Sequence, residues 1–500
     1  MSYIVPHYIN GRLLKETSTP SHTIHNPALG EAIGQVHFAS KAICEKAVSA
    51  AKEAAESWGN TPASKRVQPL FKFRELLIRN QMDLAKIITH EHGKTLDDAM
   101  GSVMRGIEVV EFHCGLINQL KGSFSADVSN HIDCHTLRQP LGICLGVSPF
   151  NFPVMVPIWM MIPAIACGNS FILKPSEQNP SAPLRLLELL NDAGLPPGVV
   201  NCLQGDKNTV QYLLEHPDIQ AVTAVGSTPV AESIYTTATA QGKRAHTFGG
   251  AKNHCLVMPD ADLNQAATAI VGAAYGSAGE RCMAISVVVA VGNHTADALI
   301  AKMAPQIRAI RINAGEVSGT DMGPLISSAH RQKVLDAVNQ GVQEGARLIL
   351  DGRAFKHPQN PQGYFLGPCL FDEVTPEMSI YTNEIFGPVL VVIRVNDFEE
   401  GIQLINKHQY GNGTAIFTRD GFSAREYSRR VQAGMVGVNI PIPVPIANHP
   451  FGGWKRSVFG DTNMHGEESI HFYTRRKTIT SKWLITDLKE TAFIMPTHKE

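Results

Sequence analysis

Short runs of β-branched and other apolar residues alternate with longer helical patterns along most of this 500-residue chain. The strand pattern occurs at Ile143 to Ser148, Ser170 to Lys174 and Val199 to Leu203, and the helical pattern occurs at Pro180 to Ala193. Strand, helix and strand at this spacing are typical of a parallel sheet that is covered by helices on both faces. The sequence therefore predicts an α/β protein with a doubly wound sheet.

The alternation resumes in the second half of the chain, and two segments depart from it. After Ala251 the strand pattern returns at Val287 to Val291, Arg347 to Leu350, Val389 to Val395 and Gly413 to Phe417. His131 to Gln139 and Phe472 to Ile479 instead alternate polar and apolar residues, as half-exposed strands do, and we expect them to form a projecting arm. The pattern from Pro69 to His92 predicts one long amphipathic helix.

Composition excludes several classes of protein. Apolar residues make up 44% of the chain, and Lys+Arg 44 against Asp+Glu 45 leave a net charge of −1. Intrinsic disorder requires a more polar chain, and nucleic-acid binding usually requires a basic excess. The longest apolar stretch, Pro153 to Cys167, contains prolines and is too short to span a bilayer. We therefore expect neither nucleic acid nor a membrane as a partner.

Cysteine usage and the N-terminus predict a cytoplasmic protein. Met1 to Gly11 has neither the basic nor the apolar region of a signal peptide. The nine cysteines form no C-x-x-C pair, so neither a disulfide framework nor a zinc site is expected. His90 and His92 have the wrong spacing for two metal ligands on one helix face, and we expect no metal.

Cys282 is the candidate nucleophile. It follows a run of small residues in Gly276 to Met283 (G-S-A-G-E-R-C-M) and stands beside Arg281. Small residues let a substrate approach closely, and a neighbouring cation is expected to lower the pKa of the thiol. A lone cysteine is more often a small buried apolar residue, but a core cysteine does not need a glycine-rich approach.

Three loops that follow strands supply further candidates. Asn151 lies between two prolines in P-F-N-F-P, where a rigid amide could stabilise an oxyanion, although the segment can also be read as a turn. Lys174 and Glu177 end a strand at the edge where ligands of α/β sheets bind, or simply precede a capped helix. The Gly-Ser-Thr helix start after Val225 suits phosphate but is more often only a cap. Neither G-x-G-x-x-G nor a Walker A loop is present.

Together and in this order, the motifs closely resemble those of the aldehyde dehydrogenase superfamily over nearly the whole chain. The matching segments are Y-I-N-G (Tyr8 to Gly11), the Asn26-Pro27 turn, P-F-N-F-P, K-P-S-E, V-G-S-T, G-G-A-K, G-E-R-C, E-I-F-G-P and Phe451-Gly452-Gly453. The resemblance implies a doubly wound NAD-binding domain (residues 1–121 and 143–249), an α/β catalytic domain (250–440) and a β oligomerisation arm (122–142 and 470–500). It also implies a homodimer or homotetramer.

The same resemblance assigns roles to residues. Cys282 would attack the aldehyde, and Asn151 with the backbone N–H of Cys282 would hold the oxyanion. NAD is the implied cofactor, and Glu177 favours it over NADP because a carboxylate near the adenosine 2′-hydroxyl repels a 2′-phosphate. The residues implied in cofactor binding are Ser148, Phe150, Lys174, Glu177, Ser227, Gly249 and Glu384.

One departure from the superfamily pattern bears on how the acyl group is released. Most members carry a water-activating glutamate where this chain has Thr247, and threonine cannot act as a general base at neutral pH. Gly249 to Asp260 and the segment around Cys282 resemble the methylmalonate-semialdehyde dehydrogenase branch, in which coenzyme A takes the acyl group. The implied reaction is NAD-dependent oxidation of malonate or methylmalonate semialdehyde to acetyl-CoA or propionyl-CoA, with loss of CO₂, through a thioacyl intermediate on Cys282.

Arg105 and Arg281 are candidates for binding the substrate carboxylate. Arginines that match both positions are implicated in this role in that branch, and a buried carboxylate needs such a partner. Alternatively, Arg105 pairs with Glu108 on an exposed helix face, and Arg281 only tunes the thiolate. Two other functions stay open, namely a hydrolytic aldehyde dehydrogenase that releases a free acid and a structural protein that keeps the fold without activity.

Overall fold

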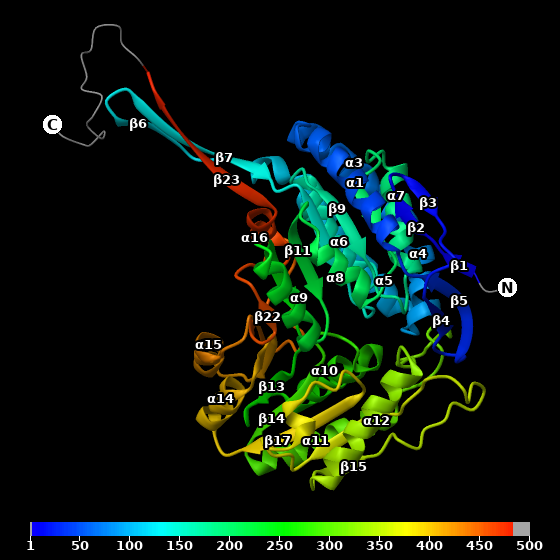
Figure 1. Ribbon diagram of the computed structural model, residues 1–500. Coiled ribbons are helices and arrows are strands. Elements are labelled where there is room, and N and C mark those ends of the chain that lie inside the picture. The colour runs from blue at the N-terminus through cyan, green and yellow to red at the C-terminus, as the bar shows by residue number, and fades with distance from the viewer. Residues whose placement is uncertain (1–2, 484–500) are drawn as a thin grey trace.

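Two β-sheets covered by helices organise the protein in the computed structural model, which describes residues 3–483 (Figure 1). The first sheet has the strand order β22-β12-β11-β8-β9-β10-β2-β3. Its five central strands pair in parallel, and β22, β2 and β3 pair antiparallel at the two ends. The bounds are β22 (Val458–Phe459), β12 (Arg244–Phe248), β11 (Ile219–Val225), β8 (Ile143–Val147), β9 (Ser170–Lys174), β10 (Val200–Cys202), β2 (His7–Ile9) and β3 (Arg12–Leu14).

Successive residues of β8 face two different cores. Ile143 and Leu145 pack in the core that contains α1, α8 and α9, whereas Cys144 packs in the core that contains α3, α5, α6 and α7. Side chains that alternate between two covered faces are what a doubly wound sheet requires, and this confirms the predicted class. The helices are α1 (Lys41–Gly59), α3 (Gln68–Arg79), α5 (Leu96–Cys114), α6 (Met155–Ala166), α7 (Ser181–Asp192), α8 (Lys207–Glu215) and α9 (Thr228–Ala240).

The single helix predicted from Pro69 to His92 is wrong. Helix α3 ends at Arg79, and α4 (Gln81–His92) begins after Asn80. The side-chain amide of Asn80 donates to the carbonyl oxygen of Leu76 at 2.8 Å. Asparagine offers the backbone such local hydrogen bonds in competition with the helix, which explains the division at this residue.

The second sheet has the order β15-β16-β17-β14-β13-β19-β20, and all its pairs are parallel except β15 with β16. Its strands are β15 (Arg347–Leu350), β16 (Cys369–Asp372), β17 (Val389–Val395), β14 (Ile285–Val291), β13 (Asn253–Val257), β19 (Gly413–Phe417) and β20 (Met435–Val438). Its main helices are α10 (Leu263–Tyr275), α11 (Asn293–Arg308), α12 (Ser328–Gln343), α14 (Phe398–Lys407) and α15 (Gly421–Arg430).

Each sheet with its covering helices forms one lobe, the first lobe around the eight-stranded sheet and the second around the seven-stranded sheet. Shorter elements connect and flank these two lobes. A three-stranded sheet near the N-terminus has the order β1-β5-β4, and β18 pairs with β21. The bounds are β1 (Tyr3–Val5), β4 (Ser21–Asn26), β5 (Glu31–His37), β18 (Tyr410–Gly411), β21 (Trp454–Lys455), α2 (Ala63–Arg66), η1 (Leu116–Asn118), η2 (Gly276–Gly279), α13 (Ser379–Thr382) and α16 (Gly466–Phe472).

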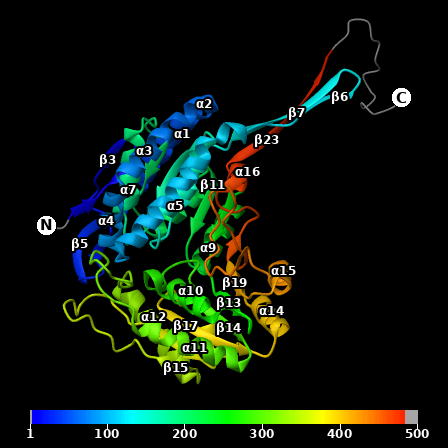
Figure 2. The same ribbon diagram turned by 180° about the vertical axis from the view of Figure 1, so that it is seen from behind.

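The two segments with alternating polarity pair with each other and project clear of both lobes, as both ribbon views show (Figures 1 and 2). Strand β23 (Thr474–Lys482) runs antiparallel to β7 (Ile132–Pro140), and β6 (Phe124–Ser129) completes the three-stranded arm. Strand β23 begins two residues later than predicted, because Phe472 is the last residue of α16. Residues 484–500, which the predicted arm includes, lie outside the described residues.

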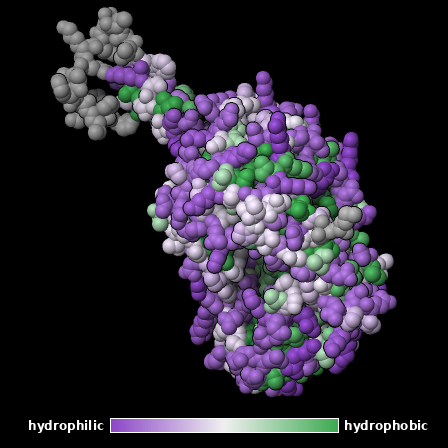
Figure 3. Space-filling view, turned by 45° about the vertical axis from the view of Figure 1, so that its right-hand side comes forward, coloured by the Kyte–Doolittle hydropathy of each residue, from purple (hydrophilic) through white to green (hydrophobic). Residues whose placement is uncertain are grey.

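Polar side chains cover most of the face seen in the space-filling view, and hydrophobic ones gather there only in small patches (Figure 3). Among residues 3–483, none of the helices has the length and apolar character needed to cross a membrane.

Candidate active site

The carboxyl ends of four neighbouring parallel strands gather the predicted cofactor residues of the first lobe. Strands β12, β11, β8 and β9 are adjacent, and their register places Val225 beside Phe248 and Val147 beside Lys174. Parallel strands end at one edge of a sheet, which is where α/β folds bind ligands. The predicted residues on this edge or in the loops that leave it are Ser148, Phe150, Lys174, Glu177, Ser227 and Gly249.

Polar groups along this edge fit a dinucleotide. Nζ of Lys174 donates to Oε2 of Glu177 at 2.9 Å, and Oγ of Ser148 is buried without a hydrogen-bond partner among the described residues. Burial of Glu177 is outweighed by the charge of Lys174 and by a backbone N–H, so the pKa of this carboxyl is lowered and it stays ionised. Ser227 is exposed at the N-terminus of α9 and makes no side-chain cap bond, which leaves backbone N–H groups for a phosphate.

Cys282 lies in the second lobe, on a strained turn between α10 and β14. Ser277 and Ala278 have φ values of 54° and 52°, in the left-handed region that residues with a Cβ seldom adopt. Gly279 follows with φ 74°, and a Cβ there would lie 2.2 Å from the carbonyl oxygen of Gly387. The small residues before Cys282 therefore serve a backbone path that larger residues could not follow.

Two asparagine amides fix the backbone of the turn. Nδ2 of Asn253, on β13, donates to the carbonyl oxygens of Cys282 (2.8 Å) and Ala284 (2.9 Å). Nδ2 of Asn412 donates to the same Cys282 oxygen at 3.0 Å. The carbonyl oxygen of Cys282 thus has two donors, and the backbone around the thiol is held in one position.

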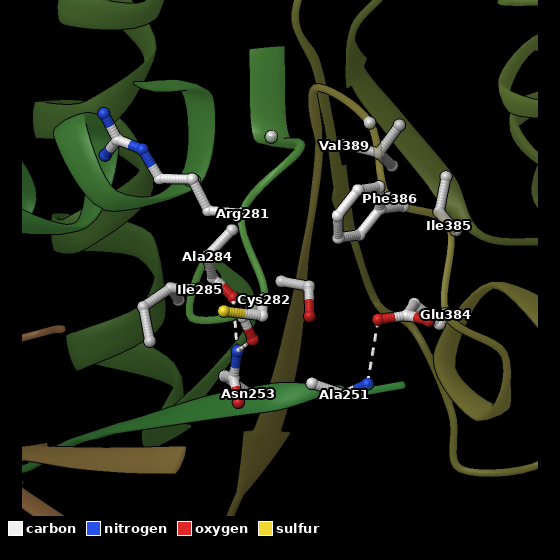
Figure 4. A pocket seen from close by; sticks show the side chains of 14 residues that line it. Ala251, Asn253, Arg281, Cys282, Ala284, Ile285, Glu384, Ile385, Phe386 and Val389 are labelled. Carbon is white, nitrogen blue, oxygen red and sulfur yellow. Dashed lines mark hydrogen bonds between the residues drawn. The ribbon is translucent and has the colours of Figure 1, made fainter. Parts of the chain in front are cut away.

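A small pocket opens beside Cys282, whose side chain is partly exposed (Figure 4). Glu384 lies across the pocket on the loop before β17, and its Oε1 accepts from the backbone N–H of Ala251 at 2.8 Å. Phe386, two residues further along this loop, also lines the pocket. The Glu384 loop and the Cys282 turn therefore face each other.

Asn151 reaches this turn from the first lobe. It is buried, and its Nδ2 donates to the carbonyl oxygen of Glu280 at 3.1 Å. The structure therefore brings the candidate oxyanion donor and the candidate nucleophile together from separate sheets. An amide nitrogen carries two hydrogens, so one N–H of Asn151 remains for a substrate oxygen.

The pattern of the aldehyde dehydrogenase family matches residues 14–479. This chain belongs to the aldehyde dehydrogenase family. The malonate-semialdehyde dehydrogenase of Pseudomonas aeruginosa is 54% identical over 477 residues, which are 95% of this chain and 96% of that protein. The malonate-semialdehyde dehydrogenase of Halalkalibacterium halodurans is 46% identical over 476 residues, 95% of this chain and 98% of that protein.

Solved structures of similar proteins have the same fold. A protein from Sinorhizobium meliloti, provisionally named a methylmalonate-semialdehyde dehydrogenase and complexed with NAD, aligns with a TM-score of 0.96 at 52% identity, over 97% of this chain and 99% of that one. The methylmalonate-semialdehyde dehydrogenase of Oceanimonas doudoroffii aligns with a TM-score of 0.96 at 50% identity, over 98% and 100%. The resemblance and the fold inferred from the sequence are confirmed.

The resemblance places Thr247 where most aldehyde dehydrogenases carry a water-activating glutamate. Thr247 is fully buried on β12, and its Oγ1 donates to the carbonyl oxygen of Ala231 on α9 at 2.8 Å. The hydroxyl proton is already committed to this bond, and a threonine side chain has no group that titrates near neutral pH. This position supplies no base for water.

The expectation that Arg281 lowers the pKa of the thiol is wrong. Burial, followed by the charge of Glu384, raises the pKa of Cys282 to about 12. The side chain of Arg281 extends away from the sulfur (Figure 4) and pairs with Asp98. The charge of Lys94 and nearby backbone N–H groups lower the pKa of Cys282 and so partly offset the effect of burial.

Glu384 is itself a perturbed group, because burial raises its pKa to about 7, with partial compensation by the Ala251 N–H and by Lys252. Lys252 is buried too and donates to the carbonyl oxygens of Ile380 (2.7 Å) and Asn383 (2.8 Å). The charge of Glu384 therefore changes near neutral pH, within range of the thiol.

Both candidate substrate arginines form ion pairs. Nη1 of Arg105 lies 2.9 Å from Oε2 of Glu108, as the alternative interpretation expects, and its side chain is 36% exposed. Asp98 and Arg105 are seven residues apart on α5 and therefore face the same side of this helix. The position of Arg105 is compatible with either role.

Sequence reasoning missed Lys94 and Asp98. Lys94 is fully buried between α4 and α5, contacting Asn151 and Asp98. The i, i+4 spacing of Lys94 and Asp98 is visible in the sequence. The residues around Lys94 give no sign that this lysine is buried. His92, considered as a metal ligand, is buried against Phe150, and among residues 3–483 no metal-binding group of His, Cys, Asp and Glu is found.

Proposed function

We propose that this aldehyde dehydrogenase oxidises malonate or methylmalonate semialdehyde with NAD and transfers the acyl group to coenzyme A, releasing CO₂ and acetyl-CoA or propionyl-CoA. The similar proteins named for these semialdehydes support the proposal, since they cover nearly the whole chain. The observation that carries it is the hydrogen bond from Thr247 to Ala231. Without a base for water at this position, an acyl enzyme persists until a better nucleophile, such as the thiolate of coenzyme A, attacks it.

The residues around Cys282 account for the chemistry of the acyl enzyme. The sulfur attacks the aldehyde carbon to form a thiohemiacetal, whose oxyanion accepts hydrogen bonds from the free N–H of Asn151 and the backbone N–H of Cys282. Bound NAD would supply the hydride acceptor, and loss of a hydride from the thiohemiacetal gives a thioester on Cys282. The carboxylate of the substrate leaves as CO₂, and a proton takes its place on the carbon that carried it. The thiol of coenzyme A displaces Cys282, which recovers a proton, and the product leaves as acetyl-CoA or propionyl-CoA.

The cofactor would lie along the carboxyl edge of the first sheet. Lys174 and Glu177 would bind the adenine ribose, with Ser148 and Phe150 beside them at the end of β8. Ser227 would contact the pyrophosphate at the start of α9. Gly249 and Glu384 would contact the nicotinamide half, which places it next to the Cys282 turn.

The division into domains follows from the same proposal. Residues 1–121 and 143–249 would bind NAD, residues 250–440 would carry Cys282, and the arm would join subunits. Exposed strand edges such as those of β6 and β23 favour pairing with another chain, and a second copy is the expected partner in a dimer or tetramer. All nine cysteines are unpaired, which supports a cytoplasmic location.

One assay separates this function from hydrolytic oxidation. NADH formation from malonate semialdehyde is measured with and without coenzyme A, and the products are identified by mass spectrometry. We expect sustained turnover only with coenzyme A, and acetyl-CoA as the product. Equal rates without coenzyme A, with a free acid as product, would show the hydrolytic reaction instead.

A further inference from the structure

We propose that Asp98 and Lys94 are positioning residues for substrate binding, Asp98 through Arg281 and Lys94 through Asn151. This inference rests on the proposed function, because it assigns Arg281 to the substrate carboxylate and Asn151 to the oxyanion. Asp98 lies in the first turn of α5, and Lys94 lies four residues earlier, in the loop just before the N-cap residue Thr95. Asp98 contacts Arg281, and Lys94 contacts Asn151.

Lys94 holds the loop that carries Asn151. Its side chain is completely buried, and its Nζ donates to the backbone carbonyl oxygen of Asn151 at 2.8 Å. The same ammonium group lies 4.1 Å from the ring centroid of Phe152, the next residue of this loop. A buried cation that binds both residues restricts the loop to one position.

Asp98 connects this lysine to Arg281. Its Oδ1 accepts from Nη2 of Arg281, and its Oδ2 lies 3.3 Å from Nζ of Lys94. The charges of both cations outweigh the effect of burial and hold the pKa of Asp98 well below its usual range. Asp98 also lies in the first turn of α5, capped by Thr95, where the helix dipole favours a negative charge.

The contacts close a ring that ends one residue before the nucleophile. From Asn151 the ring runs through Lys94, Asp98 and Arg281, and it returns through the hydrogen bond from Asn151 to the carbonyl oxygen of Glu280. Cys282 is the residue that follows Arg281. The oxyanion donor, the arginine and the thiol are therefore held relative to one another by two side chains that contact no substrate.

The charges of this group match a substrate with one carboxylate. Asp98 alone would cancel the formal charge of Arg281, and a protonated Lys94 brings the formal charge of the three side chains to +1. Burial lowers the pKa of Lys94, and the neighbouring charge of Asp98 opposes this decrease. The side chain of Arg281 is 23% exposed, whereas that of Lys94 is fully buried. Of the two cations, only the arginine can meet the ligand, so we assign Lys94 to supplying charge and Asp98 to orienting Arg281.

The test compares malonate semialdehyde with propanal, which has no carboxylate, in CoA-dependent turnover of the full-length protein. Asp98→Ala frees Arg281 and should raise KM for malonate semialdehyde about 10-fold, whereas its effect on kcat/KM for propanal, which is transmitted only through Lys94, should be several-fold smaller. Lys94→Met should lower kcat for both aldehydes by roughly 10-fold or more, because any thiohemiacetal oxyanion needs Asn151. Asp97→Ala, at an exposed position of the same turn, is the matched control and should change neither.

A double-mutant cycle shows whether Asp98 acts through Arg281. In an Arg281→Ala background, Asp98→Ala should have no further effect on KM for malonate semialdehyde. An unchanged or lower KM in Asp98→Ala alone would overturn the proposal, because Asp98 would then be only a counterion that competes with the substrate. Equal damage to both aldehydes by Asp98→Ala would also overturn it, in favour of a role in folding.

Two measurements keep the test interpretable. Thermal unfolding is recorded for every variant. If Asp98→Ala does not fold, Asp98→Asn replaces it, because asparagine keeps the side-chain volume and one acceptor oxygen. The KM of Asp98→Asn for malonate semialdehyde should rise by a smaller factor than that expected for Asp98→Ala. The proposed function fails separately, if the unmodified protein gives no CoA-dependent product from malonate semialdehyde. The Lys94→Met effect on kcat is then measured with propanal, where an unchanged kcat would contradict the role of Lys94.

Discussion

Oγ1 of Thr247 lies 2.8 Å from the carbonyl oxygen of Ala231, and this hydrogen bond joins strand β12 to helix α9 at the position where most aldehyde dehydrogenases carry a water-activating glutamate. The side chain is fully buried, so the bond is protected from solvent. The hydroxyl thus contributes to the packing of the first lobe and not to proton transfer. Under the proposed function, the release of the acyl group then depends on the thiol of coenzyme A.

Thr247→Val tests this reading of the hydroxyl. Valine keeps the shape and removes the donor, so we expect CoA-dependent turnover to stay within about 2-fold of the original, since a structural hydroxyl takes no part in chemistry. The free energy of unfolding should fall by about 1 kcal/mol, the typical contribution of one such bond. Loss of thioester formation in a folded variant would show that Thr247 has a catalytic role.

Cys282→Ala should abolish aldehyde oxidation, because no other group in the pocket can form the thioacyl intermediate. NAD binding should stay nearly unchanged, since the proposed cofactor contacts lie on other residues. Tryptophan fluorescence or calorimetry measures the binding, and NADH formation measures the oxidation. Full turnover by this variant would contradict the assignment of the nucleophile.

The sequence predicted those parts of the fold that depend on local pattern. Strands β9, β17 and β19 have the predicted bounds, because a buried parallel strand is a continuous apolar run that ends at turn residues. The break between α3 and α4 at Asn80 was not predicted. The helical repeat of apolar residues continues across this position, so the pattern does not reveal that the Asn80 side chain competes for a backbone hydrogen bond of the helix.

The site was predictable as a set of motifs, but its electrostatics were not. The order of motifs identified Cys282 and Asn151, which the structure brings together. The pKa of Cys282 depends instead on burial and on Glu384, which is 102 positions away in sequence, so that adjacency to Arg281 was misleading. Lys94 was missed for the same reason, because its burial against the loop of Asn151 and Phe152 is a property of the packed structure.

The reactivity of Cys282 should depend on pH through Glu384. The carboxyl of Glu384 is charged above its pKa of about 7, and this charge raises the pKa of the thiol. In the absence of NAD, Glu384→Gln should therefore speed alkylation of Cys282 by iodoacetamide above about pH 7, and the difference should vanish as the pH falls below it. Peptide mapping by mass spectrometry separates Cys282 from Cys134, which is also partly exposed. A constant ratio of rates across this range would exclude Glu384 as the titrating group.

Cofactor preference should depend on Glu177. The carboxylate is kept ionised by Lys174, 2.9 Å away, and would repel the 2′-phosphate of NADP. Glu177→Ser should raise the ratio of kcat/KM for NADP to that for NAD by about 10-fold or more, the equivalent of one charged hydrogen bond. Ser176→Ala, in the same loop, serves as the control. Comparable efficiency with both cofactors before any substitution would show that Glu177 does not select NAD.

Substituting each partner of the Arg105–Glu108 ion pair in turn distinguishes a role of Arg105 in substrate binding from a structural role. Arg105→Leu should raise KM for malonate semialdehyde by roughly 10- to 100-fold, since a charged hydrogen bond contributes about 1.5–3 kcal/mol, and should barely affect propanal. Glu108→Ala removes the same pair, in which Nη1 of Arg105 and Oε2 of Glu108 are 2.9 Å apart, but leaves the arginine in place. A half-exposed pair of this kind contributes little to stability, so Glu108→Ala should leave KM unchanged or lower it by freeing the guanidinium. If both variants instead raise KM equally, or if Arg105→Leu impairs propanal as much as malonate semialdehyde, then the pair is structural and the carboxylate of the substrate is bound elsewhere.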